Sequence, residues 1–445
     1  MAHHEIDKLI RDAVFGDDAG KAKARKAIHM QARQSGAISS SIYPLYRAIG
    51  RGELDPKFTV PAFNIRALTY DSARAMFRAA KRHDVGAFIF EIARSEIGYT
   101  EQRPAEYAAA VLAAAIREGW KGPIFIQGDH FQASAKKWAT EEGKKSEVKA
   151  LESLIDEAIA AEFYNIDIDT STLVDLSFPT REAQQRTNYE YTAHFTKYIR
   201  SKQPKGIDIS IGGEIGEVGK YNTQPDEVRA YMDGIRRKLG GESGIAKISV
   251  QTGTSHGGVP MADGSIAEAK IDFNVLKEVT AILRKEYGVA GSVQHGASTL
   301  PEQVFNKFPE SKAVEIHLAT GFQNMVLDAA TLPKEMKEEI RQFCFANCAD
   351  ERKSGETDEQ FVYKTRKKAI GPFKQRMWDM DEKAKQPIVD ALEKKFEFLM
   401  EKLGVFGSRD IVNRYVKATP VDLPEYAAAS AELTAAATVD PNEGE

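Results

Sequence analysis

The sequence predicts an α/β protein that folds as a (β/α)8 TIM barrel with N-terminal and C-terminal helical extensions. Two observations carry this prediction. From Phe58 onward, short apolar runs alternate with longer amphipathic stretches, which is typical of βα units. There are eight such runs, and eight parallel strands are the number that closes a barrel. A doubly wound open sheet is the main alternative, because it shares the alternating pattern.

Each apolar run has the length of a buried strand and ends near a polar residue. The eight strands are expected at Thr59–Asn64, Ala87–Ile92, Pro123–Gly128, Phe163–Asp169, Asp208–Glu214, Ile245–Gln251, Gly291–His295 and Ala313–His317. Apolar residues at helical spacing predict helices between most of them. The clearest helices are expected at Tyr70–His83, Pro104–Glu118, Lys145–Ala161 and Asp226–Leu239.

The regions before and after the strands lack this alternation of short apolar runs and longer amphipathic stretches. We expect an N-terminal helical extension at residues 1–57 and the barrel at residues 58–330. A C-terminal helical extension is expected at residues 331–426, followed by a disordered tail at residues 427–445. In the C-terminal extension, helices are expected at Pro333–Asn347, Asp358–Met380 and Asp381–Leu403. We expect these helices to pack on the barrel or on a partner subunit.

Composition excludes several classes of protein. The 445 residues carry a formal net charge of −4, which does not suggest a nucleic-acid-binding protein. No apolar run approaches membrane-spanning length, so no membrane association is expected. The two cysteines, Cys344 and Cys348, predict a buried pair of small residues on one helical face rather than a disulfide framework. We therefore expect a cytoplasmic protein.

Polar side chains end nearly every expected strand. They are Asn64, Glu91, Asp129 with His130, Asp167 with Asp169, Glu214, Gln251, His295 and His317. In a barrel the carboxyl ends of the strands meet at one mouth, where active sites form. Such a regular series of acids and imidazoles predicts an active site there.

Three histidines at or just beyond strand ends predict a metal site. These are His130, His256 and His295, each close to a glycine. Three neutral imidazoles leave one coordination position open, which is the arrangement of a catalytic rather than a structural zinc site. The sequence therefore predicts one catalytic Zn²⁺ site.

Asp129 directly precedes His130. Adjacent side chains at a strand end are expected to point different ways, so that one holds the metal and the other faces the substrate. A carboxylate in that place can move a proton to or from a substrate hydroxyl. Alternatively, Asp129 only orients a metal ligand.

Glycine-flanked segments after the last three expected strands predict phosphate binding. They are Gly253–Gly258, His295–Ser298 and Ala319–Gly321. Backbone N–H groups in such loops, and at the helix N-termini that follow, attract phosphate. In barrels this site often follows the seventh and eighth strands.

Five short motifs in order resemble the class II, metal-dependent ketose-bisphosphate aldolases, of the fructose- and tagatose-bisphosphate type. They are Val60–Asn64, Gly128–His130, Glu214–Gly219, Gly253–Gly257 and His295–Ser298, and the resemblance covers about Phe58 to Asp328. It implies a zinc enzyme on a (β/α)8 barrel that cleaves a ketose bisphosphate to dihydroxyacetone phosphate and an aldehyde. It also implies a homodimer or a larger homo-oligomer.

The resemblance implies a role for each matched residue. His130, His256 and His295 would hold zinc, Asp129 would be the catalytic proton shuttle, and Asp169 with Glu214 would form an acidic pair able to hold a second divalent metal. Gly257, Gly296, Ser298 and Thr320 would bind phosphate, and the two glycines could also bind a monovalent cation. Asn64 and His317 would contact the substrate, and Arg366 could reach its second phosphate, although a solvated helix face is the stronger interpretation of Arg366.

Some positions depart from the family pattern. His317 and Ala319 stand where the family often has Asn and Asp, and Ala93 stands where a serine is usual. The segment Lys220–Gln224 interrupts the loop that commonly supplies a base. These changes lie at the substrate end, so fructose 1,6-bisphosphate is the leading substrate and a different phosphosugar stays open.

Three other functions compete with this interpretation. A non-catalytic or regulatory subunit could keep the barrel and the metal, and a metal-dependent hydrolase or isomerase could use the same mouth. A Schiff-base lysine would be the metal-free route to an aldol cleavage. No lysine lies at the expected strand ends, which disfavours that route.

Overall fold

The computed structural model describes residues 3–216, 221–240, 244–253, 271–298 and 300–421. His256, Gly257 and the tail expected from residue 427 lie outside these ranges, and so do most of the Gly253–Gly258 segment and part of Glu214–Gly219.

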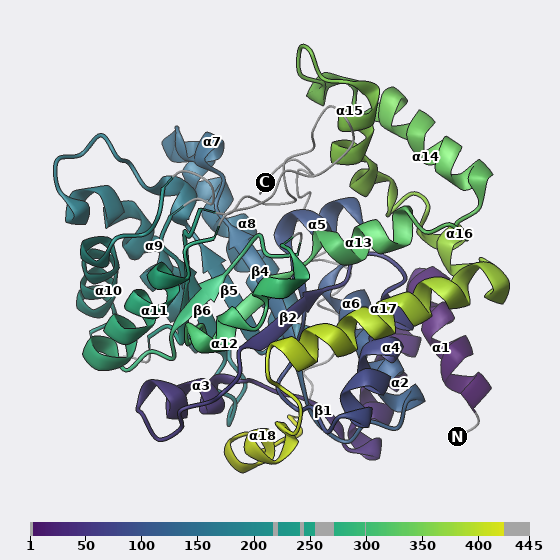
Figure 1. Cartoon of the computed structure of the whole chain (residues 1–445), viewed down its shortest axis with the longest axis horizontal. Helices are drawn as coiled ribbons and strands as arrows, with labels where there is room; N and C mark the ends of the chain where they lie inside the picture. Colours follow the sequence, from purple (N-terminus) through teal and green to yellow (C-terminus); the bar gives the residue numbers. More distant parts are fainter. Residues whose placement is uncertain (1–2, 217–220, 241–243, 254–270, 299, 422–445) are drawn as a thin grey trace.

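Eight parallel strands of the described chain close into a barrel (Figure 1). They are β2 (Val60–Asn64), β3 (Ile89–Ala93), β4 (Gly122–Gln132), β5 (Asn165–Asp169), β6 (Ser210–Glu214), β7 (Lys247–Val250), β8 (Ser292–Gln294) and β9 (Glu315–Leu318). The last strand pairs with the first, with Val60 opposite Glu315 and Phe63 opposite Leu318. The predicted TIM barrel is therefore confirmed, and the open-sheet alternative is wrong.

Helices between the strands cover the outside of the barrel. The longer ones are α4 (Thr69–Arg82), α6 (Pro104–Arg117), α8 (Glu141–Ala160), α9 (Arg181–Lys202), α10 (Pro225–Leu239) and α11 (Phe273–Ile282). Shorter elements are α5 (Arg94–Tyr99), α7 (Ala135–Trp138), η1 (Ser171–Leu173), η2 (Leu283–Tyr287), η3 (Glu302–Val304) and α12 (Lys307–Glu310). Helices cover the outside of the barrel and side chains fill its interior. The strands are therefore buried on both faces and are rich in apolar residues.

The N-terminal extension packs partly against the outer helix α6 and partly at the amino end of β4. It consists of α1 (His3–Phe15), α2 (Asp18–Ser35), β1 (Ala37–Ser39) and α3 (Tyr43–Gly50). The strand β1 pairs with the first residues of β4, Ala37 opposite Gly122, whereas the end of β4 pairs with β5. The Asn165 side chain joins the two regions, because it accepts from the Ile42 N–H at 2.9 Å and donates to the Ser40 carbonyl at 3.2 Å. The sequence did not predict β1, since three residues are too few to show a period.

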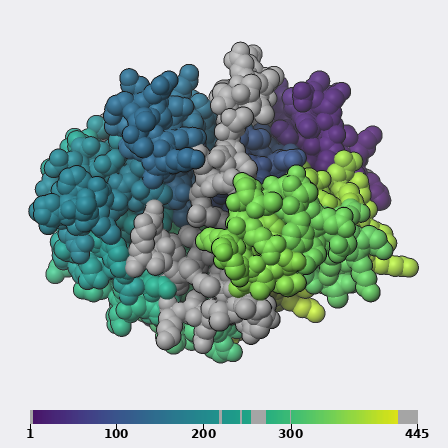
Figure 2. Space-filling model, turned by 90° about the horizontal axis from the view of Figure 1, so that it is seen from above, coloured from purple at the N-terminus to yellow at the C-terminus, as the bar shows by residue number. Residues whose placement is uncertain are grey.

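The C-terminal extension rises above the carboxyl ends of the strands and then returns to the barrel wall. The helix α13 (Thr320–Leu327) follows β9 within the barrel, and the extension consists of α14 (Lys334–Asn347), η4 (Ala349–Glu351), α15 (Asp358–Thr365), η5 (Arg366–Ala369), α16 (Lys374–Trp378), α17 (Glu382–Lys402) and α18 (Arg409–Tyr415). Figure 2 shows the light green part of this extension on one side of the upper face, opposite the blue residues around α7 and α8. The long helix α17 packs Phe396 against Phe63 of β2 and Phe322 of α13.

One expected helix of this extension is wrong. The range Asp358–Met380 is divided into α15, η5 and α16. The break surrounds Gly371-Pro372, where Pro cannot continue a helix. At Gly371 a Cβ atom would lie 2.6 Å from the Tyr99 carbonyl oxygen, so the extension approaches the end of α5 more closely than another residue allows. Cys344 and Cys348 are buried free thiols, as expected.

Among the described helices, none combines the length and the apolar character needed to cross a membrane.

Candidate active site

A pocket of about 680 Å³ opens at the carboxyl ends of the strands. This volume lies within the range of small-molecule binding sites. Most of the described residues that the sequence predicted for the site line it: Asn64, Asp129, His130, His295, Gly296, Ser298, His317 and Thr320. Ala93 and Ala319, two of the positions that depart from the family pattern, line the pocket as well.

A bulge near the end of β4 places the two central side chains. Between Gly128 and Phe131, β4 holds one residue more than β5 opposite it. Gly128 permits this, because a Cβ atom there would lie 2.4 Å from the Phe131 ring. His130 takes a positive φ of 39°, a strained value for a non-glycine residue. Asp129 and His130 therefore do not diverge as strand alternation predicts, and Asp129 Oδ1 lies 3.9 Å from His130 Nε2.

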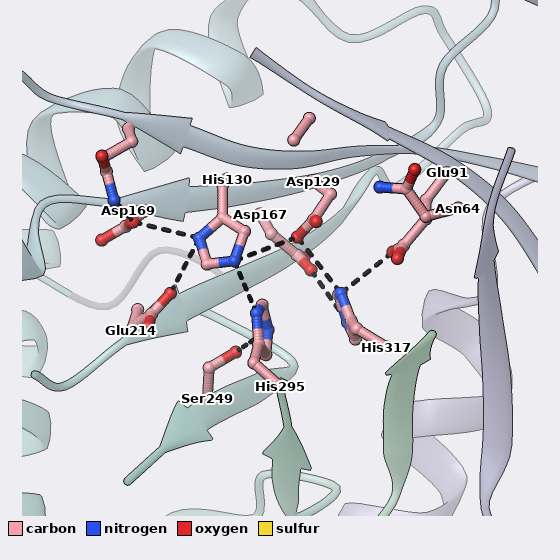
Figure 3. A network of polar contacts seen from close by, with 12 residues as sticks. Asn64, Glu91, Asp129, His130, Asp167, Asp169, Glu214, Ser249, His295 and His317 are labelled. Atoms are coloured by element: carbon pink, nitrogen blue, oxygen red, sulfur yellow. Dashed lines mark hydrogen bonds and ion pairs between the residues drawn. The ribbon is translucent and has the colours of Figure 1, made fainter. Parts of the chain in front are cut away.

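The imidazoles of His130 and His295 point at each other across the barrel mouth (Figure 3). His130 Nε2 and His295 Nδ1 are 2.6 Å apart. A carboxylate oxygen of Asp129 joins them in a group whose potential ligand atoms all lie within 4.8 Å of one another. Two ring nitrogens and a carboxylate are donors that zinc accepts.

The other nitrogen of each ring is held by oxygen. His130 Nδ1 lies 3.1 Å from Asp169 Oδ2 and 3.2 Å from Glu214 Oε2. His295 Nε2 lies 2.8 Å from Ser249 Oγ. When these nitrogens carry the protons, His130 Nε2 and His295 Nδ1 present their lone pairs to a common point. Oxygen atoms that fix the tautomer in this way are the usual partners of metal-binding histidines, so the residues present fit a divalent metal.

The charges around His130 also favour a cation. Burial opposes protonation of His130, but Asp129 and Glu214 outweigh it and raise its pKa well above the usual range. Burial, followed by the nearby Asp169 charge, raises the pKa of Glu214 to about 7. Carboxylates gathered this closely repel one another, and a bound dication would relieve that repulsion.

His317 extends the site on the side away from His130. Its Nδ1 lies 3.1 Å from Asp129 Oδ1 and 3.0 Å from Glu91 Oε2. Its ring stacks on that of His295, with the ring centres 4.1 Å apart. Although burial opposes ionisation of Asp129, His130 and His317 hold the pKa of this carboxyl well below its usual value. Asp129 is thus an ionised group between two imidazoles.

Below these residues, a buried lysine fills the barrel interior. Lys247 Nζ donates to Gln127 at 2.7 Å and pairs with Asp167 at 2.9 Å and with Glu315. Burial opposes its charge, but Asp167 and Glu315 raise its pKa. A lysine held as an ammonium is not a Schiff-base nucleophile, which agrees with the sequence argument against that route.

Sequence reasoning missed Lys247 and Glu315. The signal that could have found them is the period of two along a strand, because Lys247 shares a strand face with Ser249, and Glu315 shares one with His317.

The far wall of the pocket comes from the C-terminal extension. Lys353, Lys364 and Lys367 line it, together with Arg66 from the segment after β2. Arg366 is directed elsewhere, because its guanidinium pairs with Asp328 and donates to Asn324 Oδ1 at 2.9 Å. Sequence reasoning chose Arg366 from this basic cluster and did not predict that Lys364 and Lys367 line the pocket instead.

A family model described as fructose-bisphosphate aldolase class-II matches residues 54–402. The chain belongs to this family. Membership supports a class II aldolase, that is, a carbon–carbon lyase, and such enzymes typically depend on a metal. No curated protein matches the sequence.

Several solved structures are similar to this chain at low sequence identity. A protein from Sinorhizobium meliloti 1021, described as a probable tagatose 6 phosphate kinase, is 17% identical with a TM-score of 0.51, over 85% of this chain and 100% of that one. Fructose-bisphosphate aldolase from Campylobacter jejuni is 17% identical with a TM-score of 0.48, over 82% of this chain and 94% of that one. The YdjI aldolase from Escherichia coli K12 is 15% identical with a TM-score of 0.42, over 78% and 100%.

Proposed function

We propose that this class II aldolase uses zinc to cleave a ketose bisphosphate, with fructose 1,6-bisphosphate as the leading substrate, to dihydroxyacetone phosphate and an aldehyde such as glyceraldehyde 3-phosphate. One observation carries the proposal: His130 Nε2 and His295 Nδ1 converge at 2.6 Å while oxygen atoms hold the opposite ring nitrogens. By the sequence motif, His256 is the third ligand.

His130 and His295, with His256, would hold the metal in the mouth of the barrel. The chemistry that zinc supplies there is Lewis-acid polarisation of a carbonyl and stabilisation of the negative charge left when the carbon–carbon bond breaks. Asp169, Glu214 and Ser249 orient the two described ligands through their other ring nitrogens. Asp169 and Glu214, with His130, could also hold a second divalent ion, since their ligand atoms cluster in the same way.

Asp129 would move the proton. It lines the pocket beside both imidazoles and is ionised, so it can accept the proton of the substrate hydroxyl next to the bond that breaks. His317 fixes the orientation of that carboxylate through its 3.1 Å contact. In the reverse direction Asp129 would return the proton.

The loops after β8 and β9 would bind the phosphate nearest the carbonyl. Gly296 and Ser298 line the pocket after β8, and Thr320 begins α13 after β9. Backbone N–H groups at that helix N-terminus are oriented to attract an anion. Asn64 and His317 would contact the sugar hydroxyls. Gly257 is expected to complete this cradle and, with Gly296, to bind a monovalent cation. We further expect a cytoplasmic homodimer or larger homo-oligomer.

The test is an enzyme-coupled assay of triose phosphate released from fructose 1,6-bisphosphate, with metal content measured on the same sample. We expect zinc in the protein, release that a chelator stops, and recovery on adding zinc. Zinc without turnover would favour a non-catalytic subunit or another phosphosugar, which a panel of ketose phosphates would separate. Turnover that resists a chelator would contradict the metal mechanism.

A further inference from the structure

The imidazole of His317 holds the carboxylate of Asp129 in place. Among the residues that the structure describes, His317 is the one whose side chain lies within hydrogen-bond distance of this carboxylate, with Nδ1 3.1 Å from Asp129 Oδ1 (Figure 3). His130 Nε2 is farther from the same oxygen, at 3.9 Å. The Nδ1 atom of His317 also lies 3.0 Å from Glu91 Oε2. The direction in which Asp129 points therefore depends on how the ring of His317 is held.

The other nitrogen of this ring is held by Glu315. The two residues are two positions apart on β9 and so lie on the same face of the strand. His317 Nε2 is 2.7 Å from Glu315 Oε1. Glu315 is fully buried and is not among the residues that line the pocket. It can therefore influence the reaction only through another side chain, and His317 is the side chain that reaches from Glu315 to Asp129.

The other partners of Glu315 show which atom carries the hydrogen in this contact. Its carboxylate accepts from the Lys247 ammonium, from Gln127 Nε2 at 3.0 Å and from the Tyr46 hydroxyl. A carboxyl group surrounded by three donors is an ionised acceptor, so the hydrogen between Glu315 and His317 belongs to the ring Nε2. Nδ1 faces two further carboxylates and must also carry a hydrogen in order to donate to them.

The residue at position 317 explains why such a partner is needed. The family often has an asparagine where this chain has His317. An asparagine amide carries its N–H donors in any surroundings, whereas a neutral imidazole can carry its hydrogen on either nitrogen. A partner that fixes the ring and its hydrogens is therefore required for Nδ1 to act as a donor.

We propose that Glu315 is a positioning residue for proton transfer, because it holds the imidazole of His317 so that the Nδ1–H is directed at Asp129. The proposal rests on the proposed function for the role of Asp129. It makes the barrel interior, with Lys247 beside Glu315, a part of the enzyme that acts on the reaction without contacting the substrate. Misplacement of a reacting group by about 1 Å can lower the rate by about 100-fold, so even a small rotation of Asp129 matters.

The first test is a double-mutant cycle on kcat for fructose 1,6-bisphosphate. Glu315→Gln should lower kcat by about 10- to 100-fold with KM nearly unchanged. Lys247 keeps Asp167 as a partner at 2.9 Å, so the variant leaves no lone charge in the interior. In the His317→Asn background the same change should lower kcat by less than about 2-fold, because there is no imidazole to orient. An equal fall in both backgrounds, or no fall in the wild type, would overturn the proposal.

Two further variants guard against a general loss of packing. Glu106→Gln is the matched control, since Glu106 is a buried carboxylate whose ion pairs are with Lys374 at 2.6 Å and Arg25 at 3.4 Å. It should lower stability and leave kcat unchanged, and a fall of kcat as large as that of Glu315→Gln would overturn the proposal. Glu315→Asp keeps the charge but withdraws it by one methylene. If Glu315→Gln does not fold, the cycle is run with Glu315→Asp and read in the same way.

A second test does not need turnover. Nitrogen-15 NMR of histidine-labelled protein reads the ring of His317, whose signals are those that His317→Asn removes. In the wild type near neutral pH both ring nitrogens should carry a hydrogen, and Glu315→Gln should shift the Nε2 signal. A wild-type Nε2 without a hydrogen, or identical signals in the two proteins, would overturn the proposal. If the wild type cleaves no ketose phosphate while these signals behave as expected, the proposed reaction fails and the positioning of His317 by Glu315 stands.

Discussion

The N-terminal extension and the α14 to η5 part of the C-terminal extension contact different parts of the barrel and contribute different properties, although the end of the C-terminal extension returns to the amino ends of the strands, where the Thr59 N–H donates to the Leu403 carbonyl at 3.0 Å. In the N-terminal extension, β1 pairs with the first residues of β4, α2 packs against α6, and His29 and Arg33 of α2 contact Glu162. The C-terminal extension lies over the carboxyl ends and places lysines in the pocket. In barrels the amino end generally serves stability and the carboxyl end function. The N-terminal extension therefore adds contacts to the fold, and the C-terminal extension adds side chains to the pocket in which the barrel residues lie.

The largest effect should come from the barrel itself. His295→Ala removes a ring nitrogen that points at His130 Nε2. We expect zinc content and aldol cleavage to fall to background while circular dichroism and the melting temperature change little. Atomic absorption and the triose phosphate assay check this. Full activity in this variant would show that the reaction does not depend on the barrel site.

Asp129→Asn should separate chemistry from metal binding. The amide keeps the size of the side chain but cannot accept the substrate proton, so kcat should fall by ~10²–10⁴-fold. Zinc content should stay near that of the wild type. Stopped-flow or steady-state kinetics with metal analysis on one sample make the measurement. Loss of zinc in proportion to activity would instead make Asp129 a ligand.

Ser249→Ala tests the orientation of His295. Removing the oxygen that lies 2.8 Å from Nε2 should weaken zinc binding by about 10- to 100-fold. Competition with a fluorescent chelator measures the affinity. Thr280→Ala is a matched control, because its hydroxyl bonds to Ser292 at 2.8 Å away from the imidazoles. Equal zinc affinity in both variants would contradict the role of Ser249.

The smallest effect on activity should come from the N-terminal extension. Glu162 accepts from His29 at 3.1 Å and pairs with Arg33, and although burial opposes its ionisation, His29 and Arg33 lower its pKa. A carboxyl with a depressed pKa in the folded state stabilises the fold above its ordinary pKa of about 4.3, and this stability is lost as pH falls through the folded value.

Glu162→Gln should therefore lower the free energy of unfolding by about 1–3 kcal/mol near neutral pH, with kcat/KM unchanged, and the difference from the wild type should shrink in acid. Urea unfolding at several pH values measures it. Glu152→Gln, which removes a half-exposed pair with His194, is the control and should change stability by less than ~1 kcal/mol. A Glu162 variant that lost activity but not stability would break the comparison between the extensions.

Much of the barrel could be predicted because its strands repeat a simple pattern. Each apolar run fills a wall that is buried on both faces, and each ends on a polar residue at the mouth, so counting runs was enough to place His130, His295 and His317 together. The bulge could not be predicted in the same way. It depends on the packing of Phe131 against Gly128, a contact that no periodicity encodes, and it decides where Asp129 points.

The sequence also did not predict which residues of the C-terminal extension line the pocket. Lys367 and Arg66 are 301 residues apart, and only the tertiary fold brings them to one pocket. The Gly371-Pro372 dipeptide that interrupts the expected helix was visible in the sequence. The helical spacing of the residues on both sides nevertheless favoured one continuous helix. Lys247 was hidden for a different reason, since a charged residue in a barrel interior is stable only with partners that come from other strands.

The measurement that tests the central claim most directly is anomalous X-ray scattering from crystals of the zinc-loaded protein, recorded at the zinc absorption edge. The account predicts a strong peak bound by His130 Nε2 and His295 Nδ1, with His256 as a further ligand. A fully loaded crystal with its zinc peak away from these two imidazoles would contradict it.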